Sequence, residues 1–182
     1  MNTINLHTLL LNILKSVKEY RDGILITRLI KMAYLVEVLY YRKFHQRLTD
    51  AQWVYYKYGP YIMDIDTHLS DRNIIAEEIE DKELTKFMVK DYAEIDEVPA
   101  EVQTIISSII RKYHDVELSD LLDYVYYETE PMMNADQRGE VLDFLKILPS
   151  EYYKVKKLEC SDDVIKDIKL KYKEKIKNAK HL

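Results

Sequence analysis

The residue types that most often carry out chemistry are few and scattered in this chain. Five histidines show neither an HExxH pattern nor the spacing of paired metal ligands: His7, His45, His68, His114 and His181. The single cysteine, Cys160, has no histidine beside it in the sequence, and no glycine-rich phosphate loop occurs. We therefore predict no catalytic residue, no cofactor and no metal site, and we predict that the protein is not an enzyme.

One short stretch does concentrate possible metal ligands, namely Asp64, Asp66, His68 and Asp71. On a helix, Asp64 and His68 would share a face because they are four residues apart. Such a pair is common by chance on a charged surface. We therefore interpret the stretch as a solvated helix face.

The composition is that of a globular protein rich in helix. The chain has 182 residues, of which 47% are hydrophobic and 32% charged, so it can bury a substantial core. Only three glycines and four prolines occur, which disfavours a fold with many tight turns and favours long helices. Sixteen tyrosines against three phenylalanines indicate many half-buried or partner-facing positions, because tyrosine combines bulk with a polar tip.

Charge is unevenly distributed along the chain. Residues 164–182 hold seven lysines and two acidic residues, a local charge of +5, which leaves −10 for residues 1–163 out of the total of −5. An acidic body is not typical of a nucleic-acid-binding protein. One cysteine cannot form an intramolecular disulfide and fits a reducing cytoplasm, where we expect the protein. We read no secretion signal and no membrane span, since no apolar run approaches 18 residues.

Hydrophobic periodicity predicts a single compact, mainly α-helical domain with one small β-hairpin and a winged-helix-like order in its middle. We expect helices over residues 3–20, ended by Gly23 as a C′ residue, and over 27–45, which is apolar nearly all round. Further expected elements are an extended piece at 53–58, a helix opened by Pro60, and a hairpin over 73–92, for which two helical turns are the alternative. They are followed by a helix from Pro99, a helix capped by Asp115, and a last helix carrying Val141, Leu142 and Leu145. Residues 1–149 form the predicted domain and 150–182 a Lys-rich helical tail.

Two signatures in the first half of the chain resemble those of a known family. The first is Arg28-Leu29-Ile30-Lys31-Met32-Ala33-Tyr34, and the second is the aromatic segment from Trp53 to Tyr58-Gly59-Pro60 about twenty residues later. Together, at this spacing, they resemble the Panacea domain of SocA-like antitoxins. The resemblance runs over roughly residues 5–147. The chain departs from many members near Tyr127 to Met133, where those members carry a histidine and later a tryptophan.

The resemblance implies a helical cytoplasmic protein that neutralises a partner toxin by direct protein–protein contact. It also implies a second mode, in which a member acts as an adaptor that hands the toxin to a protease. The predicted partners are thus a cognate toxin and, in the second mode, a protease. The alternative is a DNA-binding regulator of winged-helix type. Against that alternative, the predicted wing is acidic, with Glu77, Glu78, Glu80, Asp81 and Glu83.

The predicted partner-binding residues are Lys31, Tyr34, Trp53, Lys57, Tyr58, Gly59 and Pro60. Each also has a purely structural interpretation. Lys31 either extends its amine to solvent or is a buried or groove-lining charge near the Tyr58-Gly59-Pro60 turn, where it bonds a carbonyl or a carboxylate of a partner. Trp53 and its neighbouring tyrosines either fill the core or form an aromatic surface that anchors a partner. Gly59 and Pro60 are foremost turn residues.

Overall fold

The computed structural model describes residues 3–79 and 84–148 of the chain. The elements, in chain order, are α1 (Leu6–Val17), β1 (Ile24–Leu25), α2 (Ile26–Phe44), β2 (Val54–Tyr56), β3 (Gly59–Tyr61), α3 (Ile65–Leu69), β4 (Ile74–Ile79), β5 (Leu84–Val89), α4 (Ala100–Tyr113), α5 (Leu118–Tyr127), α6 (Glu130–Met133) and a 3-10 turn (Phe144–Lys146). The expected helical tail over 150–182, and with it the boundary near residue 149, lies outside the described residues.

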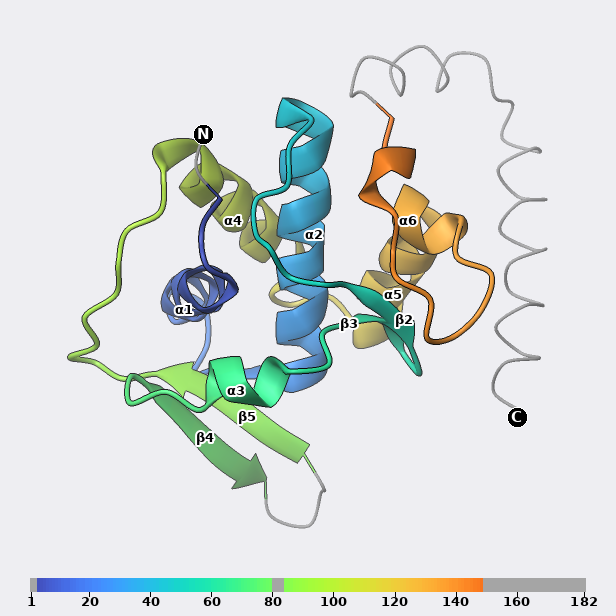
Figure 1. Cartoon of the computed structure of the whole chain (residues 1–182). Coiled ribbons are helices and arrows are strands. Elements are labelled where there is room, and N and C mark those ends of the chain that lie inside the picture. The colour runs from blue at the N-terminus through green and yellow to red at the C-terminus, as the bar shows by residue number, and fades with distance from the viewer. Residues whose placement is uncertain (1–2, 80–83, 149–182) are drawn as a thin grey trace.

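Helix α2 is the centre of the molecule. Every residue from Leu29 to Val38 is buried, which explains why its sequence is apolar nearly all round. Figure 1 shows α2 standing in the middle, with α1 and α4 on one side and α5 and α6 on the other. The prediction of a helix over residues 27–45 is confirmed. Burial of this kind contributes about 1.5–3 kcal/mol per large apolar side chain, so α2 holds the surrounding elements together.

The predicted fold class, mainly α-helical with one small hairpin, is wrong. Strands form 16% of the described residues beside 47% helix, in one three-stranded and one two-stranded antiparallel sheet. The expected hairpin exists as β4 and β5, but β1 extends it, pairing Ile24 with Phe87 and Leu25 with Lys86. Two residues are too few to show a strand periodicity, so β1 could not be read from the sequence.

The second sheet replaces the helix that we expected Pro60 to open. Strand β3 begins at Gly59 and pairs with β2, with Tyr56 opposite Gly59 and Val54 opposite Tyr61. Pro60 is tolerated because it lies on an edge strand, where its missing N–H removes no ladder bond. Only Ile65–Leu69 of the expected helix forms, as α3. The expected winged-helix order, in which the Gly-Pro turn led directly into a helix, is wrong at this point.

The other differences concern element ends. Helix α1 stops at Val17, and Gly23, with φ +118°, immediately precedes β1 instead of capping the helix. The N-cap residue of helix α5 is Glu117, whose side chain makes no capping bond, and not Asp115. The expected helix through Val141 and Leu145 is wrong, because residues 139–142 run beside β2 and only a 3-10 turn follows.

The 139–142 segment completes the β2–β3 ribbon on its other side. Its backbone bonds join Tyr55 N–H to Glu140 O at 2.8 Å, Gly139 N–H to Tyr55 O at 2.7 Å, and Leu142 N–H to Trp53 O at 2.8 Å. The extended pairing satisfies backbone groups that a helix would have satisfied internally. No helix in the described part of the chain is long and apolar enough to cross a membrane.

Candidate functional site

The two sequence signatures meet through one hydrogen bond. The side chain of Lys31 leaves α2, and its Nζ donates to the carbonyl oxygen of Pro60 on β3 at 2.7 Å. Only 2% of Lys31 is exposed, so its amine does not extend to solvent. Of the two interpretations of Lys31, the bond to a carbonyl beside the Tyr-Gly-Pro turn is the one that the structure contains. Lys31 thereby fastens the β2–β3 ribbon to the central helix.

Burial makes Lys31 an unusual lysine. Removal from water disfavours the charged amine and lowers the pKa of Lys31 from 10.5 to about 7. A single carbonyl acceptor compensates only part of the cost of burying a charge. The residue therefore holds the ribbon in place at a cost in stability that depends on pH.

Tyr34 lies one helical turn further along the same face of α2 and meets the other half of the signature. Its ring packs edge-on against Trp53, with centroids 5.3 Å apart, and also against Phe144 at 6.0 Å. Its hydroxyl lies 3.0 Å from Thr129 Oγ1, which itself donates to the Val125 carbonyl at 2.5 Å. Thr129 has one hydroxyl proton, so Tyr34 is the donor in this chain of bonds.

Trp53 is part of the core and is only 1% exposed. Its indole Nε1 is buried and has no hydrogen-bond partner among the described residues. An indole buried in this way contributes packing and not partner contact. Of the predicted site residues, Lys31, Tyr34, Trp53, Gly59 and Pro60 thus form one buried cluster between α2 and the ribbon.

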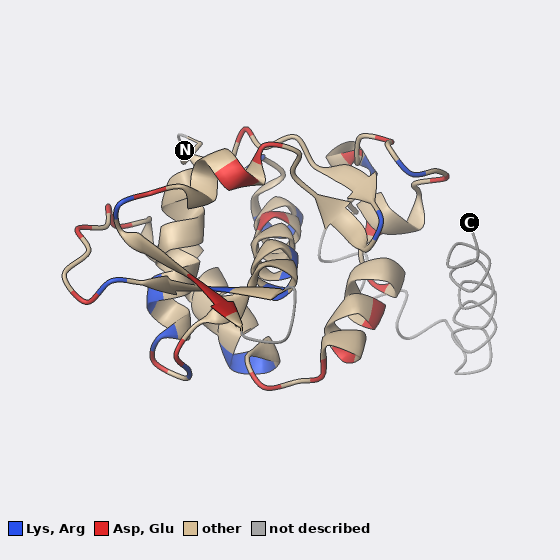
Figure 2. Ribbon diagram, turned by 90° about the horizontal axis from the view of Figure 1, so that it is seen from below, with Lys and Arg blue, Asp and Glu red and all other residues tan. Residues whose placement is uncertain are grey.

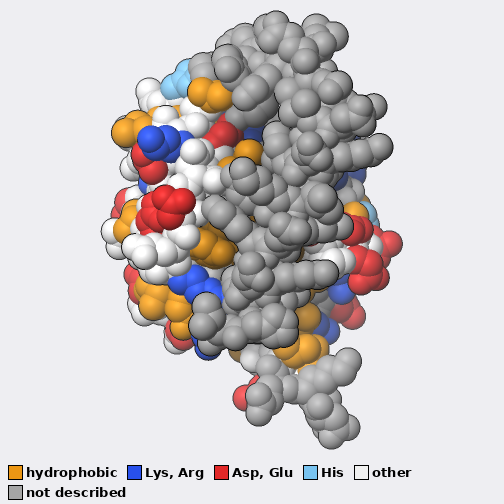
Figure 3. Space-filling view, turned by 90° about the vertical axis from the view of Figure 1, so that its right-hand side faces the viewer, with side chains coloured by type: hydrophobic (Ala, Val, Ile, Leu, Met, Phe, Trp, Pro, Cys, Tyr) orange, Lys and Arg blue, Asp and Glu red, His pale blue; other side chains and the backbone are white. Residues whose placement is uncertain are grey.

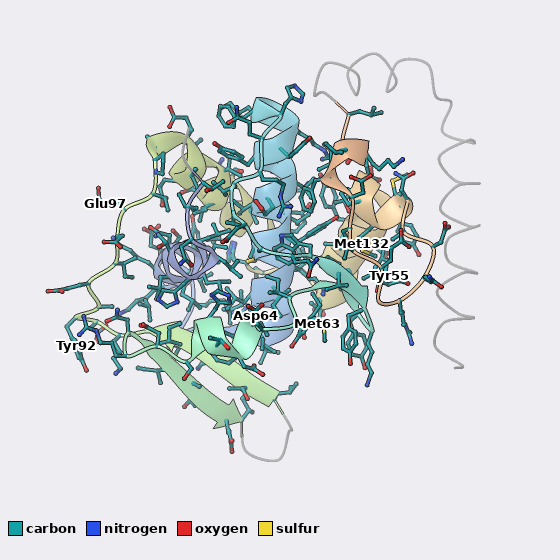
Figure 4. All side chains as sticks on the ribbon, in the orientation of Figure 1. Tyr55, Met63, Asp64, Tyr92, Glu97 and Met132 are labelled. Atoms are coloured by element: carbon teal, nitrogen blue, oxygen red, sulfur yellow. The ribbon has the colours of Figure 1, made fainter. Side chains whose placement is uncertain are left out.

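Lys57 and Tyr58 are the two predicted site residues that face solvent. They form the turn between β2 and β3, and 66% of Tyr58 is exposed. Tyr56, at the end of β2 beside the turn, is also exposed, whereas Met63 and Asp64 lie in the connection from β3 to α3, as Figure 4 shows. In Figure 3, which faces the right-hand side of Figure 1, hydrophobic side chains reach the surface at several points. We call Tyr56, Lys57 and Tyr58 the ribbon tip.

Gly59 makes the ribbon tip possible. It has φ +91°, a conformation that L side chains rarely adopt, and it follows a turn in which Lys57 and Tyr58 both keep negative φ. A Cβ at this position would lie 3.3 Å from Tyr126 Cζ on α5. The backbone conformation therefore favours glycine, and the Tyr126 ring would have to shift by a few tenths of an ångström to admit a Cβ.

Replacing Gly59 with alanine is expected to cost about 2 kcal/mol of unfolding free energy, because it combines backbone strain with the contact to Tyr126. Gly139→Ala is a matched control, since Gly139 has φ +89° but no atom within 4 Å of its would-be Cβ. We expect Gly139→Ala to cost about 1 kcal/mol. Urea unfolding of both variants measures the difference; equal losses would contradict a role for the Tyr126 contact.

The comparisons with known proteins agree with the signatures. The family model described as antitoxin SocA-like, Panacea domain, matches residues 29–131, which is more than half of the chain and includes every predicted site residue. The chain belongs to the SocA-like antitoxin family. No curated protein and no solved structure gave a significant match.

Arg28, the first residue of the first signature, helps to position the helices of the Panacea domain. Arg28 donates from its two terminal nitrogens to the carbonyl oxygens of Tyr113, at 2.7 Å, and Val116, at 2.8 Å. These carbonyls lie at the end of α4 and in the connection to α5. Arg28 thus ties that connection to α2, in a role that does not require a partner.

A buried carboxylate is the most heavily bonded group that sequence reasoning missed. Glu37 is 0% exposed and accepts bonds from Arg47 Nη2 at 3.0 Å, Thr49 Oγ1 at 2.9 Å and the backbone N–H groups of Leu48 and Thr49. Glu37 was visible in the sequence only as an exception on an apolar helix. Its bonds fasten the loop from α2 to the ribbon.

Another ion pair that the sequence did not predict, besides that of Glu37 with Arg47, joins the end of α2 to the start of α6. Arg42 Nη2 lies 2.8 Å from Glu130 Oε2 and 2.5 Å from the Glu128 carbonyl. Glu130 also accepts from the Leu148 N–H at 3.3 Å. The partners are 86 and 88 residues apart, and no spacing rule connects residues at such distances.

The other possible metal ligands in the described residues lie apart from one another or in pairs. Within residues 3–79 and 84–148, no group of three or more His, Cys, Asp or Glu side chains could hold a metal ion. Asp64 and His68 do share a face of α3, as the spacing predicted, and Asp64 Oδ2 lies 3.5 Å from His68 Nε2. Around them and on β4 the surface is acidic, with Asp66, Glu77 and Glu78 exposed. These charges would repel phosphate and disfavour the DNA-binding alternative.

Proposed function

We propose that this protein is a cytoplasmic antitoxin that neutralises a toxin by direct contact through the ribbon tip. Membership of the SocA-like antitoxin family supports an antitoxin-type role. We choose this surface because the residues of the two family signatures divide into a buried group and an exposed group. Lys31, Tyr34 and Trp53 stabilise the ribbon from within, and Lys57 and Tyr58 remain free to meet a partner.

The chemistry of the ribbon tip suits a protein partner. Tyrosine, present at two of the three positions of the tip, is enriched among residues that dominate interface energetics. Tyr56 is supported by Tyr61, with ring centroids 5.4 Å apart, so the tip keeps its shape before binding. A preorganised aromatic surface loses little conformational entropy on binding. Lys57 adds a cation that can pair with a carboxylate of the partner.

The test is neutralisation of the neighbouring gene's product by variants of the ribbon tip. Tyr58→Ala should abolish growth rescue or weaken retention of the toxin at least tenfold, since truncating a central interface tyrosine costs about 2 kcal/mol. The Tyr58→Ala variant should unfold at the same temperature as the wild-type protein, because the Tyr58 side chain is exposed. Tyr92→Ala is the matched control: Tyr92 is 80% exposed on the connection before α4, as Figure 4 shows, and its loss should change neither property.

Trp53→Ala would not test the interface, although Trp53 is among the partner-binding residues predicted from the sequence. The indole is in the core, so its removal would lower stability by about 3–5 kcal/mol and abolish binding indirectly. The proposal fails if no neighbouring gene product is toxic by itself, or if Tyr58→Ala and Lys57→Ala together leave rescue intact. Rescue that requires an intact protease in the host would support the adaptor mode instead of direct inhibition.

A further inference from the structure

Strand β4 leaves one side of the three-stranded sheet open. The strand order is β1-β5-β4, so β4 pairs with β5 on one side, and no other described segment pairs with its second side. Figure 1 shows β4 at the border of the molecule, away from α5 and α6. The strand is six residues long, which is the length of an ordinary strand. It is therefore long enough to act as a template for an additional strand.

The register identifies which backbone groups face outward. Lys90 N–H bonds Asn73 O at 2.9 Å, and in an antiparallel ladder the hydrogen-bonded positions then alternate. The backbone N–H and C=O groups of Ile75, Glu77 and Ile79 thus point toward β5. The N–H and C=O groups of Ala76 and Glu78 point away from the sheet. These two residues present two donors and two acceptors to an incoming strand.

The side chains that flank these groups differ between the two faces of β4. On the outer face, Ile75 is exposed and Ile79 half-buried, with the Glu77–Lys86 ion pair of 3.1 Å between their positions. On the other face, Ala76 and Glu78 are exposed, beyond the part of the sheet that α1 covers. A strand laid along this edge would thus contact two isoleucines and the ion pair between them on one face, and on the other an alanine and a carboxylate that has no ion-pair partner among the described residues.

Charge decides which strand the edge accepts. Natural proteins protect edges with charged side chains, which keep out apolar strands and strands of like charge. On β4 both charged residues are negative, but Lys86 lies opposite Glu77 and pairs with it. The residue opposite Glu78 is the neutral Thr85, so Glu78 is the charge that can attract a basic strand. Figure 2 shows acidic residues at the end of this strand. A second copy of β4 would bring the same glutamates together, so self-pairing is disfavoured.

We propose that the free edge of β4 binds an extended segment of a partner protein in which apolar residues alternate with lysine or arginine. The segment adds a fourth strand to the sheet, with backbone bonds to Ala76 and Glu78. Its apolar side chains lie beside Ile75 and Ile79, and its basic side chains lie beside Glu78. This surface is separate from the ribbon tip and does not depend on the proposed antitoxin function.

A synthetic peptide of alternating lysine and valine tests the proposal on the full chain. Its binding is followed by fluorescence anisotropy and by hydrogen exchange of the backbone amides. We expect saturable binding and slowed exchange at Ala76 and Glu78. A glutamate–valine peptide, and a lysine–valine peptide with alternate backbone nitrogens methylated, should not bind, because the first reverses the charge and the second removes the backbone donors.

Ala76→Pro and Glu78→Lys separate the two contributions. The proline removes one outward N–H without breaking the ladder to β5, and should weaken binding about fivefold, the effect of one hydrogen bond of about 1 kcal/mol. Ala76→Val keeps the N–H and should bind normally. Glu78→Lys should weaken the lysine peptide and admit the glutamate peptide. Equal binding by all three variants would overturn the proposal, as would a dimer in light scattering that Ala76→Pro dissociates, which would show self-pairing.

Discussion

Replacing Glu37 with alanine is expected to lower the free energy of unfolding by about 3 kcal/mol. The carboxylate is fully buried in α2 and satisfies the N–H groups of Leu48 and Thr49 together with the Thr49 hydroxyl. Alanine leaves these donors buried without an acceptor, and each such group costs about 1–3 kcal/mol. Arg47 is affected less, because it also donates to the Ala51 carbonyl at 2.7 Å and lies 4.2 Å from the Phe144 ring centroid.

Two further variants isolate this effect. Glu37→Gln keeps the volume and one acceptor oxygen, so it should lose less than the alanine variant. Glu97→Ala removes an exposed carboxylate of the connection to α4, which Figure 4 shows pointing away from the body, and should change stability by less than about 0.5 kcal/mol. Urea unfolding measures all three. A loss below about 1 kcal/mol for Glu37→Ala would contradict the role assigned to the carboxylate.

Replacing Lys31 with methionine is expected to change how stability depends on pH. The pKa of Lys31 is about 7 in the folded chain, because burial disfavours the charge, against 10.5 when the side chain is exposed. Below pH 7 the amine is protonated in both states, so the cost of burying its charge is fully present. Between pH 7 and 10.5 the unfolded chain binds more protons than the folded chain, so that cost falls as pH rises.

The wild-type protein should therefore gain about 2 kcal/mol relative to Lys31→Met between pH 7 and pH 9. Methionine carries no charge and makes no such contribution, although it leaves the Pro60 carbonyl without its donor. Denaturant unfolding of both proteins at a series of pH values measures the difference. Burial raises the pKa of Tyr34 in both proteins, so that tyrosine does not titrate in this range. Parallel pH profiles would show that the folded amine keeps an ordinary pKa.

Local patterns were enough for the long elements. The 3.6-residue period in residues 26–44 and 100–113 produces α2 and α4 almost as predicted, because a helix with an apolar face satisfies its backbone within itself. The partial alternation of apolar residues favoured the β4–β5 hairpin over two helical turns, and the structure has the hairpin. The family could be recognised from two short signatures, and the match over residues 29–131 confirms it.

Local sequence patterns gave wrong predictions for the segments whose structure depends on pairing with residues far away in the sequence. The Gly59-Pro60 pair looks like the start of a helix, but its backbone pairs with residues 54–56, which pair on their other side with residues 139–142, and the three segments form a sheet. The two-residue strand β1 exists because β5 offers it partners. Such contacts join residues far apart in the sequence, and their free energy depends on the whole fold.

The sequence by itself determined the central helix, the family and the list of residues in its signatures. The tertiary structure decided which of them face inward, because only packing sets the burial of a side chain. Lys31, Tyr34 and Trp53 are enclosed between α2 and the ribbon, while Tyr58 projects from it by virtue of the turn at Gly59. The roles of Glu37 and Glu130 depend on Arg47 and Arg42, which only the folded chain places beside them.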